Sequence, residues 1–322
     1  MLAPLNFPWS ARLCRQRERP GPSLAERRIP GLSIAVGRHG RLLWAEGFGV
    51  TDLAMATPVT VESVFPIGST SKVLTSLALG QLVERGKLDL DEPIQTYVPS
   101  FPRKACPLTA RLLAAHLCGL RNYNMAAGEY ANQREFGSVG DARAVFKDDS
   151  FLFEPGTRYV YSAYNFVLLS AAIEGASGRD FLSYVHERIA APFGLLRTTP
   201  DRRTAPMPGR VTTYVAGWGG TPMPAPPIDV SNKWAAGGFV SAPSDMVRLG
   251  NRSFAVDGRE LRVAHHGGTA NGAMSFFFIL PEVDLVVALQ VNLLFEPFSS
   301  FANTAYAVAG SFLAADGGSS SR

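Results

Sequence analysis

The sequence predicts a mixed α/β protein, in which strands from both ends of the chain build one sheet around a mainly helical insertion. One observation is a set of five short apolar runs bounded by turn residues, which is typical of strands. These runs cover residues 31–38, 42–50, 260–267, 274–281 and 284–292. The other observation is that apolar residues recur at three- and four-residue spacing through residues 108 to about 200, which is typical of helices.

This order of elements predicts four parts of the chain. The two ends are polar or arginine-rich and are expected to be poorly ordered, whereas the two strand-bearing segments are expected to fold together. The parts are a leader (1–28), a sheet domain (29–95 together with 236–316), an inserted helical domain with a loop rich in proline and glycine (96–235), and a tail (317–322).

The first half of the sheet domain predicts a hairpin followed by a helix. His39-Gly40 joins the first two strands as a two-residue turn. A helix is expected from Ser69 to about Arg85, and Gly86 is expected to end it. Residues 88–101 then predict an extended connector.

The rest of the chain predicts further helices and one long loop. Helices are expected at residues 108–120, 165–178 and 180–194, at Asp245 to Leu249, and from about Ser300 to Ala314. Residues 201–238 are rich in proline and glycine. This segment is longer than most loops that only connect two helices or strands, so it predicts a functional loop.

Composition narrows the classes of partner and cofactor. The chain has 322 residues, of which 46% are apolar and 18% are charged, and its net charge is only +4, with scattered basic residues. These values predict a globular protein without a nucleic-acid partner. No run reaches the roughly 20 apolar residues of a membrane span, so no membrane partner is expected. The sequence lacks the apolar run of a secretory signal, which predicts the cytoplasm, with a mitochondrial transit peptide as the alternative.

A Ser-x-x-Lys motif lies at the start of the predicted helix at residue 69. A positive charge in the first turn of a helix is unfavourable because of the helix dipole. The position of Lys72 therefore indicates a role other than stabilising the helix. Positions i and i+3 share one helix face, which brings Lys72 beside Ser69. In a dry site Lys72 could lose its proton near neutral pH and accept the hydroxyl proton of Ser69. The alternative is an N-capping serine and a solvated lysine.

Two further segments carry polar groups that could act with this pair. Tyr161 follows a proline-glycine turn in "FEPGTRYVYSAYNF", although a packed tyrosine with a bonded hydroxyl is the commoner case. His265 and His266 are followed by two glycines, which indicates a backbone that another group approaches closely. His116 is expected to pack or to bond the backbone, and no chemistry is assigned to Cys118.

Together these motifs resemble, in order and local context, the serine β-lactamase and penicillin-binding-protein superfamily. The resemblance runs from about Ile29 to the last helix and includes "IPGLSIAV", "LLAAHLCGL" and "KWAAGGFVSAPSDMVRLGN". It is greatest to the class C-like enzymes, the mitochondrial β-lactamase-like serine proteases and the family VIII-type esterases. It implies an antiparallel five-stranded sheet flanked by helices, with an inserted helical domain.

The resemblance also implies roles for individual residues. Ser69 would be the acylated nucleophile, Lys72 its proton partner and Tyr161 a general base or acid. The backbone N–H groups of Ser69 and Gly268 would form the oxyanion hole. His265-His266-Gly267 would be the third motif. Neighbouring residues of a strand point to opposite faces, so only one histidine would face the substrate, and the family register implies that it is His265.

The sequence departs from the family pattern at three places. Ala163 stands where the family has an asparagine that holds an acylamide substrate, and Asn165 is a candidate replacement. His265 stands where β-lactamases have a lysine. The segment from Arg248 to His265 is shorter than the family norm.

The resemblance and its departures predict a serine hydrolase, either an esterase or a peptidase or amidase, that forms an acyl-enzyme on Ser69. The expected partner is a small-molecule ester, amide or peptide. No cofactor is expected, and no metal, because Cys14, Cys106 and Cys118 lack ligand spacing. A non-catalytic or burst-only scaffold and a true class C-like β-lactamase are the alternatives. The oligomeric state is not predicted.

Overall fold

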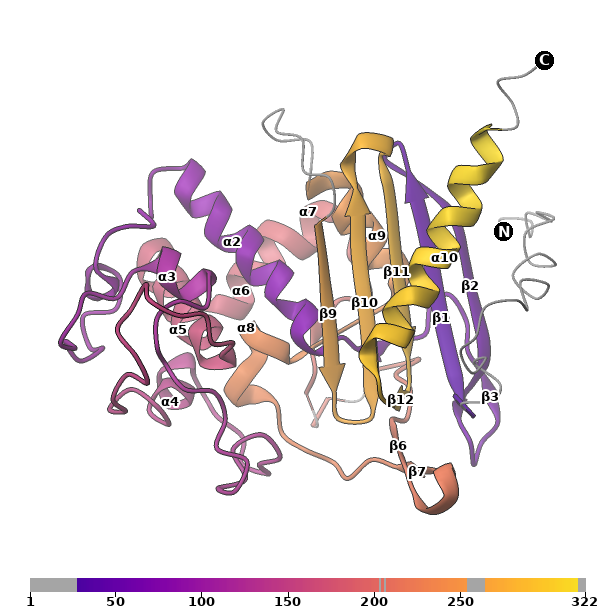
Figure 1. The fold of residues 1–322 in the computed structure, drawn as a ribbon, viewed down its shortest axis with the longest axis horizontal. Coiled ribbons are helices and arrows are strands. Elements are labelled where there is room, and N and C mark those ends of the chain that lie inside the picture. The colour runs from indigo at the N-terminus through magenta and orange to yellow at the C-terminus, as the bar shows by residue number, and fades with distance from the viewer. Residues whose placement is uncertain (1–27, 203, 206, 254–263, 318–322) are drawn as a thin grey trace.

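The computed structural model describes residues 28–202, 204–205, 207–253 and 264–317. Within them, one sheet lies between helices on its two faces, and a helical region adjoins one end of the sheet (Figure 1). The predicted leader and tail, except for Arg28 and Gly317, lie outside the described residues, as does the first half of the strand predicted at 260–267.

The main sheet is antiparallel and has six strands in the order β3-β2-β1-β11-β10-β9. The strands are β1 (Gly31–Arg38), β2 (Arg41–Asp52), β3 (Thr57–Pro58), β9 (Ala264–Ala270), β10 (Ala273–Leu280) and β11 (Leu285–Val291). The predicted fold class is therefore confirmed, but the predicted count of five strands misses β3. Two residues are too few to show a period, and Pro58 limits this strand to the sheet edge because proline has no N–H to donate.

Six further strands of two or three residues each form two three-stranded sheets. The first sheet contains β12 (Leu293–Leu294), β6 (Tyr214–Ala216) and β7 (Pro222–Pro224). The second contains β4 (Phe65–Pro66), β8 (Phe239–Ser241) and β5 (Thr199–Pro200). β4 leads directly into the segment that carries Ser69.

The helices vary widely in length. The α-helices are α2 (Lys72–Glu84), α3 (Ala110–Ala114), α4 (Val139–Arg143), α5 (Ala163–Ser177), α6 (Phe181–Val185), α7 (Ala191–Phe193), α8 (Trp234–Gly237), α9 (Pro243–Ser253) and α10 (Phe298–Gly317). The 3-10 helices are η1 (Gly68–Ser71), η2 (Ile94–Thr96), η4 (Trp218–Gly220), η5 (Ser231–Lys233) and η6 (Pro281–Val283), and η3 (His186–Ala190) is a π-helix that joins α6 to α7.

The insertion is less helical than the sequence predicts. The helix expected at 108–120 is only the five-residue α3. It ends where His116 and Gly119 adopt left-handed backbone angles, with φ of 58° and 78°. Residues 121–160 are mostly turns apart from α4, and the expected extended connector contains the short helix η2.

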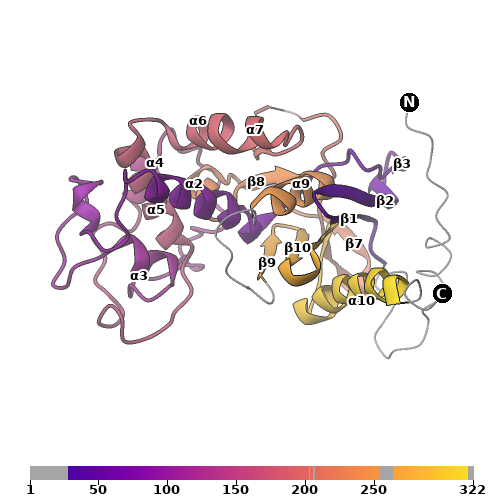
Figure 2. The same ribbon diagram turned by 90° about the horizontal axis from the view of Figure 1, so that it is seen from above.

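Side chains on the two faces of the sheet enter two different cores. On β10, Phe276 and Phe278 pack with α10, whereas Phe277 and Ile279 pack with the core of the helical region. Figure 2 shows α10 on one side of the strands and α9 on the other. Burial on both faces explains the nearly continuous apolar runs of β10 and β11.

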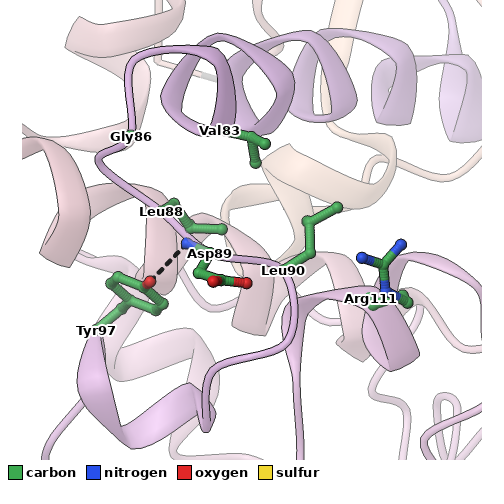
Figure 3. Close-up of a pocket in the computed structure, with 7 residues that line it drawn as sticks. All are labelled: Val83, Gly86, Leu88, Asp89, Leu90, Tyr97 and Arg111. Atoms are coloured by element: carbon green, nitrogen blue, oxygen red, sulfur yellow. Dashed lines mark hydrogen bonds between the residues drawn. The ribbon is translucent and has the colours of Figure 1, made fainter.

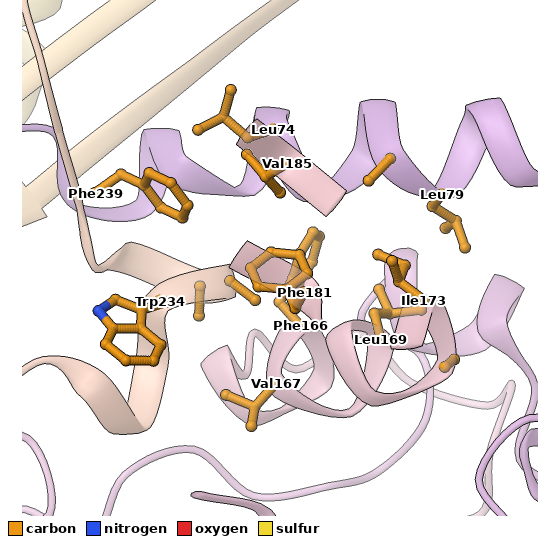
Figure 4. Close-up of a cluster of buried hydrophobic side chains, with 14 of the residues drawn as sticks. Leu74, Leu79, Phe166, Val167, Leu169, Ile173, Phe181, Val185, Trp234 and Phe239 are labelled. Atoms are coloured by element: carbon orange, nitrogen blue, oxygen red, sulfur yellow. The ribbon is translucent and has the colours of Figure 1, made fainter. Parts of the chain in front are cut away.

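Helix α2 packs among the helices of the insertion, although the sequence predicts it as part of the sheet domain. Figure 4 shows Leu79 of α2 on the side of Leu169 and Ile173 of α5, and these three residues belong with Leu74 to one buried cluster. The same cluster includes side chains of the sheet, so the predicted boundaries between the sheet domain and the insertion remain a proposal.

Strand β9 lies against the segment before α2 with no room for a side chain at Gly268. A Cβ atom there would be 1.9 Å from the carbonyl oxygen of Ile67 and 2.8 Å from Thr70 Oγ1. Ser275 of β10 lies opposite Gly268 and links β10 to the segment before α2. Its hydroxyl donates to the same Ile67 oxygen at 2.7 Å and bonds Thr70 Oγ1 at 2.6 Å. Gly268 therefore permits the close approach of β9 to η1.

We expect Gly268→Ala to lower the free energy of unfolding by about 1–3 kcal/mol, because β9 must move away from η1. Urea denaturation measures this change. The control is Gly80→Ala on the exposed side of α2, where an added Cβ contacts nothing. That variant should gain about 0.5–1 kcal/mol from the higher helix propensity of alanine. Equal effects of the two substitutions would contradict the close approach.

Candidate active site

The 3-10 helix η1 directs the Ser69 hydroxyl away from those of its neighbours. Gly68 has a left-handed φ of 49°, and its backbone abuts that of Thr269 in β9. Thr70 is fully buried and bonds Ser275, and the buried Ser71 Oγ accepts the Phe239 N–H at 3.2 Å. Of the three hydroxyls in this segment, two stabilise the fold and that of Ser69 is left to face Lys72 and Tyr161.

Lys72 is buried beside Ser69, with only 1% of its surface exposed. Its Nζ donates to Ser69 Oγ at 3.2 Å and to the carbonyl oxygen of Ala236 in α8 at 2.5 Å. The rings of Tyr161 and Phe166 lie 4.9 and 5.4 Å from Nζ, and no carboxylate of the described residues pairs with it. Burial without a counter-charge lowers the pKa of Lys72 from 10.5 to about 7.

Tyr161 completes a three-residue group around the Ser69 hydroxyl. Its Oη lies 2.7 Å from Ser69 Oγ. Burial raises the pKa of Tyr161, and the hydrogen bond with Ser69 opposes that rise. Ser69 Oγ thus lies within hydrogen-bond distance of two groups that can exchange protons, as the Ser-x-x-Lys spacing and the Tyr161 motif predict.

The structure corrects the expected orientation of the two histidines. His265 lies opposite Phe278 of β10, and its ring packs 5.7 Å from that of Phe276, on the face that α10 covers. Gly267 shares this face, since a Cβ on it would meet the ring of Phe298. Directly opposed residues of antiparallel strands share a face. The pairing with β10 therefore turns His265 away from Ser69.

His266 and Gly268 face the helical region instead. His266 lies opposite Phe277, and the positive charge of Lys72 acts on its ring. Burial, followed by the charge of Lys72, lowers the pKa of His266 to about 4, although a 2.8 Å contact between Nδ1 and the Gly267 oxygen opposes this. The histidine on the same face as Lys72 is therefore uncharged at neutral pH and supplies no permanent cation.

Asn165 does not replace the amide that Ala163 lacks. It is fully buried in α5, where its Oδ1 accepts from Cys118 Sγ at 3.0 Å and its Nδ2 donates to the Leu113 oxygen at 3.2 Å. The α-helical period moves position 165 away from the face of position 163. Ala163 itself is buried at the first turn of α5.

Two residues near the site were not assigned a site role from the sequence. Asn122 accepts the Ala163 N–H on its Oδ1 at 3.0 Å, so a side-chain amide from a distant loop lies beside Ala163. His116 bonds the backbone as expected, because its Nδ1 accepts the Ser162 N–H at 3.2 Å. Asn122 has no local pattern that could have identified it, since a loop places it beside α5.

A family model described as beta-lactamase matches residues 15–264 of the sequence. The chain belongs to the beta-lactamase family. Among its relatives, the mitochondrial serine beta-lactamase-like protein LACTB of Homo sapiens is 30% identical over an alignment of 289 residues, and the match covers 69% of this chain and 53% of LACTB. Esterase EstB of Burkholderia gladioli is 30% identical over 203 residues, which cover 57% of this chain and 52% of EstB. The chain thus spans about half the length of these relatives.

The fold of this beta-lactamase family member is also found in solved structures. The octameric penicillin-binding protein homologue from Pyrococcus abyssi superposes with a TM-score of 0.76 at 22% identity, covering 90% of this chain and 75% of that chain. Identity this low supports the fold alone. The likeness agrees with the antiparallel sheet and adjoining helices described above.

A cavity of about 380 Å³ lies at the other end of α2, and Figure 3 shows the residues that line it. It shares no residue with the group around Ser69. Its lining residues are Val83, Gly86, Leu88, Asp89, Leu90, Tyr97 and Arg111.

Within the parts of the chain that the structure describes, no group of three or more histidine, cysteine, aspartate or glutamate side chains could hold a metal ion. Over those same residues, no helix has both the length and the apolar character needed to cross a lipid bilayer.

The buried Lys72 should make stability depend on pH. Between its folded pKa of about 7 and its ordinary value of 10.5, the unfolded chain holds a proton that the folded chain has lost, so stability rises with pH through this window. Lys72→Met removes this dependence. The variant should therefore be more stable than the wild type by several kcal/mol at pH 6, and this advantage should shrink towards pH 10.

Urea denaturation of both proteins at pH 6, 7, 8, 9 and 10 measures the difference. Lys87→Met on the exposed surface after α2 is the matched control, because it makes the same substitution at a lysine that the fold does not bury. A constant difference between wild type and Lys72→Met across this range would show that Lys72 keeps its proton in the folded protein.

Proposed function

We propose that the chain is a serine hydrolase that forms an acyl-enzyme on Ser69 and acts on small uncharged esters in preference to amides, peptides or β-lactams. The observation that carries this proposal is the position of Ser69 Oγ between Lys72 Nζ, at 3.2 Å, and Tyr161 Oη, at 2.7 Å. This arrangement provides a nucleophile with two proton carriers in contact.

Acylation begins when unprotonated Lys72 takes the hydroxyl proton of Ser69. Its pKa of about 7 leaves a large unprotonated fraction at neutral pH. Ser69 Oγ bonds the ester carbonyl carbon, and the carbonyl oxygen becomes an oxyanion bound by the N–H groups of Ser69 and Gly268. As the carbonyl re-forms, the carbon–oxygen bond to the alcohol breaks, and Tyr161 gives the alkoxide a proton, which Lys72 replaces.

Deacylation reverses these roles with water in place of the alcohol. Tyr161 and Lys72 take a proton from the water as its oxygen bonds the acyl carbon. The bond from that carbon to Ser69 Oγ then breaks, and Ser69 recovers its proton from Lys72. The products are a carboxylic acid and a regenerated serine.

Two features support an uncharged ester as substrate. A β-lactam or a peptide carboxylate is best held by a permanent cation, whereas the site presents His266, whose pKa of about 4 keeps it neutral. An acylamide gains from a donor at position 163, where this chain has a buried alanine. The name of the relative EstB, an esterase, is consistent with this choice.

The alternative is a burst-only protein that acylates on Ser69 and does not deacylate, and the loss of the amide at Ala163 favours it. Hydrolysis of p-nitrophenyl acetate separates the two. Continued release of p-nitrophenol supports an enzyme, whereas one equivalent per chain supports a covalent trap.

We propose that the protein is located in the cytoplasm. Mitochondria are the alternative, because the name of the human relative LACTB includes the word mitochondrial. Cys106 and Cys118 are both free thiols in the structure, which fits either reducing compartment. Fractionation of cells that express the natural protein distinguishes the two.

We expect Ser69→Ala to abolish both ester turnover and covalent labelling by a fluorophosphonate, while the protein stays folded. Mass spectrometry of the labelled protein and thermal unfolding measure the two outcomes. Ser71→Ala is the matched control, since it loses only the acceptor for the Phe239 N–H and keeps the nucleophile. It should be less stable but still labelled. Wild-type activity in Ser69→Ala would contradict the role of Ser69 as the nucleophile.

The residue at position 266 should determine whether the enzyme prefers a neutral ester or a carboxylate-bearing one. Between pH 6 and 8 the wild-type ratio of kcat/KM for a neutral ester and a matched carboxylate-bearing ester should stay constant, because His266 is neutral throughout. His266→Lys should shift this ratio about tenfold towards the carboxylate-bearing ester, as expected for one added charge interaction.

The matched control for this test is His265→Lys, on the opposite face of β9. It adds the same charge and should leave the ratio unchanged. If His265→Lys shifts the ratio and His266→Lys does not, the orientation of the strand assigned above is wrong.

A further inference from the structure

His116 holds the backbone on both sides of Tyr161. The Val160 N–H donates to the His116 carbonyl oxygen at 3.1 Å, and the Ser162 N–H donates to His116 Nδ1 at 3.2 Å. The imidazole also lies against the phenol, with ring centroids 4.6 Å apart. Three separate contacts from one residue therefore fix the position and direction of the Tyr161 side chain.

The structure maintains His116 in a strained conformation to make these contacts. Its φ of 58° is in the left-handed region, where a residue with a Cβ atom is disfavoured by about 1–2 kcal/mol. The ring is buried, with 8% of the residue surface exposed. A glycine at this position would satisfy the backbone without strain but would offer neither the Nδ1 acceptor nor the ring.

A contact with Asn165 selects the tautomer of the His116 imidazole whose Nδ1 can accept a hydrogen bond. Asn165 Nδ2 lies 3.1 Å from the same Nδ1, while its Oδ1 is occupied by Cys118. Two donors on Nδ1 require its lone pair, so the ring proton resides on Nε2. The buried Asn165, which the sequence suggested as a substrate ligand, thus supports His116.

The charged and titratable groups around His116 keep it in this neutral form. Lys72 faces it from α2, His266 from β9, and Tyr159 and Tyr161 from the segment before α5. Burial, followed by the charges of Lys72 and His266, lowers the pKa of His116 to about 4. A neutral acceptor at Nδ1 is therefore available throughout the pH range in which Lys72 titrates.

We infer that His116 is a positioning residue for the reaction: it does not touch the reacting atoms, and it acts by holding the Tyr161 hydroxyl on Ser69 Oγ. The inference rests on the proposed function. His116 lies 45 positions before Tyr161 in the sequence. It affects proton transfer through its hydrogen bonds to the backbone on either side of Tyr161 and does not contact the substrate.

The test is a double-mutant cycle between positions 116 and 161 on a p-nitrophenyl ester, measured as kcat and KM. His116→Gly suits the left-handed backbone and removes the acceptor and the ring. We expect it to lower kcat about 10- to 100-fold, with KM changed less than about threefold, since ground-state binding is untouched. In a Tyr161→Phe background, the same substitution should cost less than about threefold, because the hydroxyl that it positions is absent.

His116→Asn is the conservative variant for rescue. Asparagine tolerates left-handed backbone, and its Oδ1 can replace Nδ1 as the acceptor for the Ser162 N–H. It should recover at least about tenfold of the kcat lost in His116→Gly. A structural role alone would lower kcat by the same factor with and without the Tyr161 hydroxyl, and that additive result would overturn the inference.

Fluorophosphonate labelling separates failure of this inference from failure of the proposed function. A wild-type protein that is neither labelled on Ser69 nor active on any ester contradicts the hydrolase itself. A wild-type protein that is labelled and active, together with a His116→Gly variant that retains full kcat, contradicts only the role of His116. Thermal unfolding of each variant confirms that the comparison is made on folded protein.

Discussion

The burial of the Lys72 side chain without a carboxylate partner is the interaction on which the rest of the site depends. An ammonium group loses several kcal/mol of hydration free energy when it is buried, and the protein returns one carbonyl oxygen, the Ser69 hydroxyl and two aromatic rings, all of them uncharged. A nearby carboxylate would stabilise the charge and raise the pKa of Lys72 again. The surroundings of Lys72 therefore favour its neutral form, which is the form able to accept a proton.

Backbone groups supply most of this environment. The carbonyl oxygen of Ala236 accepts from Lys72, and that of Ala235 accepts from Thr75 one turn further along α2, so α8 is held to α2 through main-chain acceptors. On the opposite side of Ser69, Gly268 and Gly68 let two backbones approach without side chains between them. These contacts fix the nucleophile between a helix and a strand edge that come from distant parts of the chain.

The polar side chains around the site divide into groups that carry protons and groups that hold them in place. Ser69, Lys72 and Tyr161 are in mutual contact. Ser275 and His116 instead bond backbone atoms of the segments that carry Ser69 and Tyr161, and Asn165 bonds His116 and the Leu113 oxygen of α3. The two histidines on the side of Ser69, at positions 116 and 266, both have pKa values lowered to about 4. Neither histidine therefore adds a positive charge to that of Lys72 near neutral pH.

The sequence by itself determined the fold class, the five longer strands of the sheet and the pairing of Ser69 with Lys72, because each depends on a local period of two or of three to four residues. Tyr161 was identified by its motif in the family resemblance. Only the tertiary structure decided which histidine faces Ser69. Alternation along β9 requires that His265 and His266 point to opposite faces, but the register with β10 determines which face each one meets. The burial of Asn165, the approach of Asn122 to Ala163 and the contacts of His116 around Tyr161 likewise depend on loops that meet helix α5 in space, and no local period of the sequence encodes such meetings.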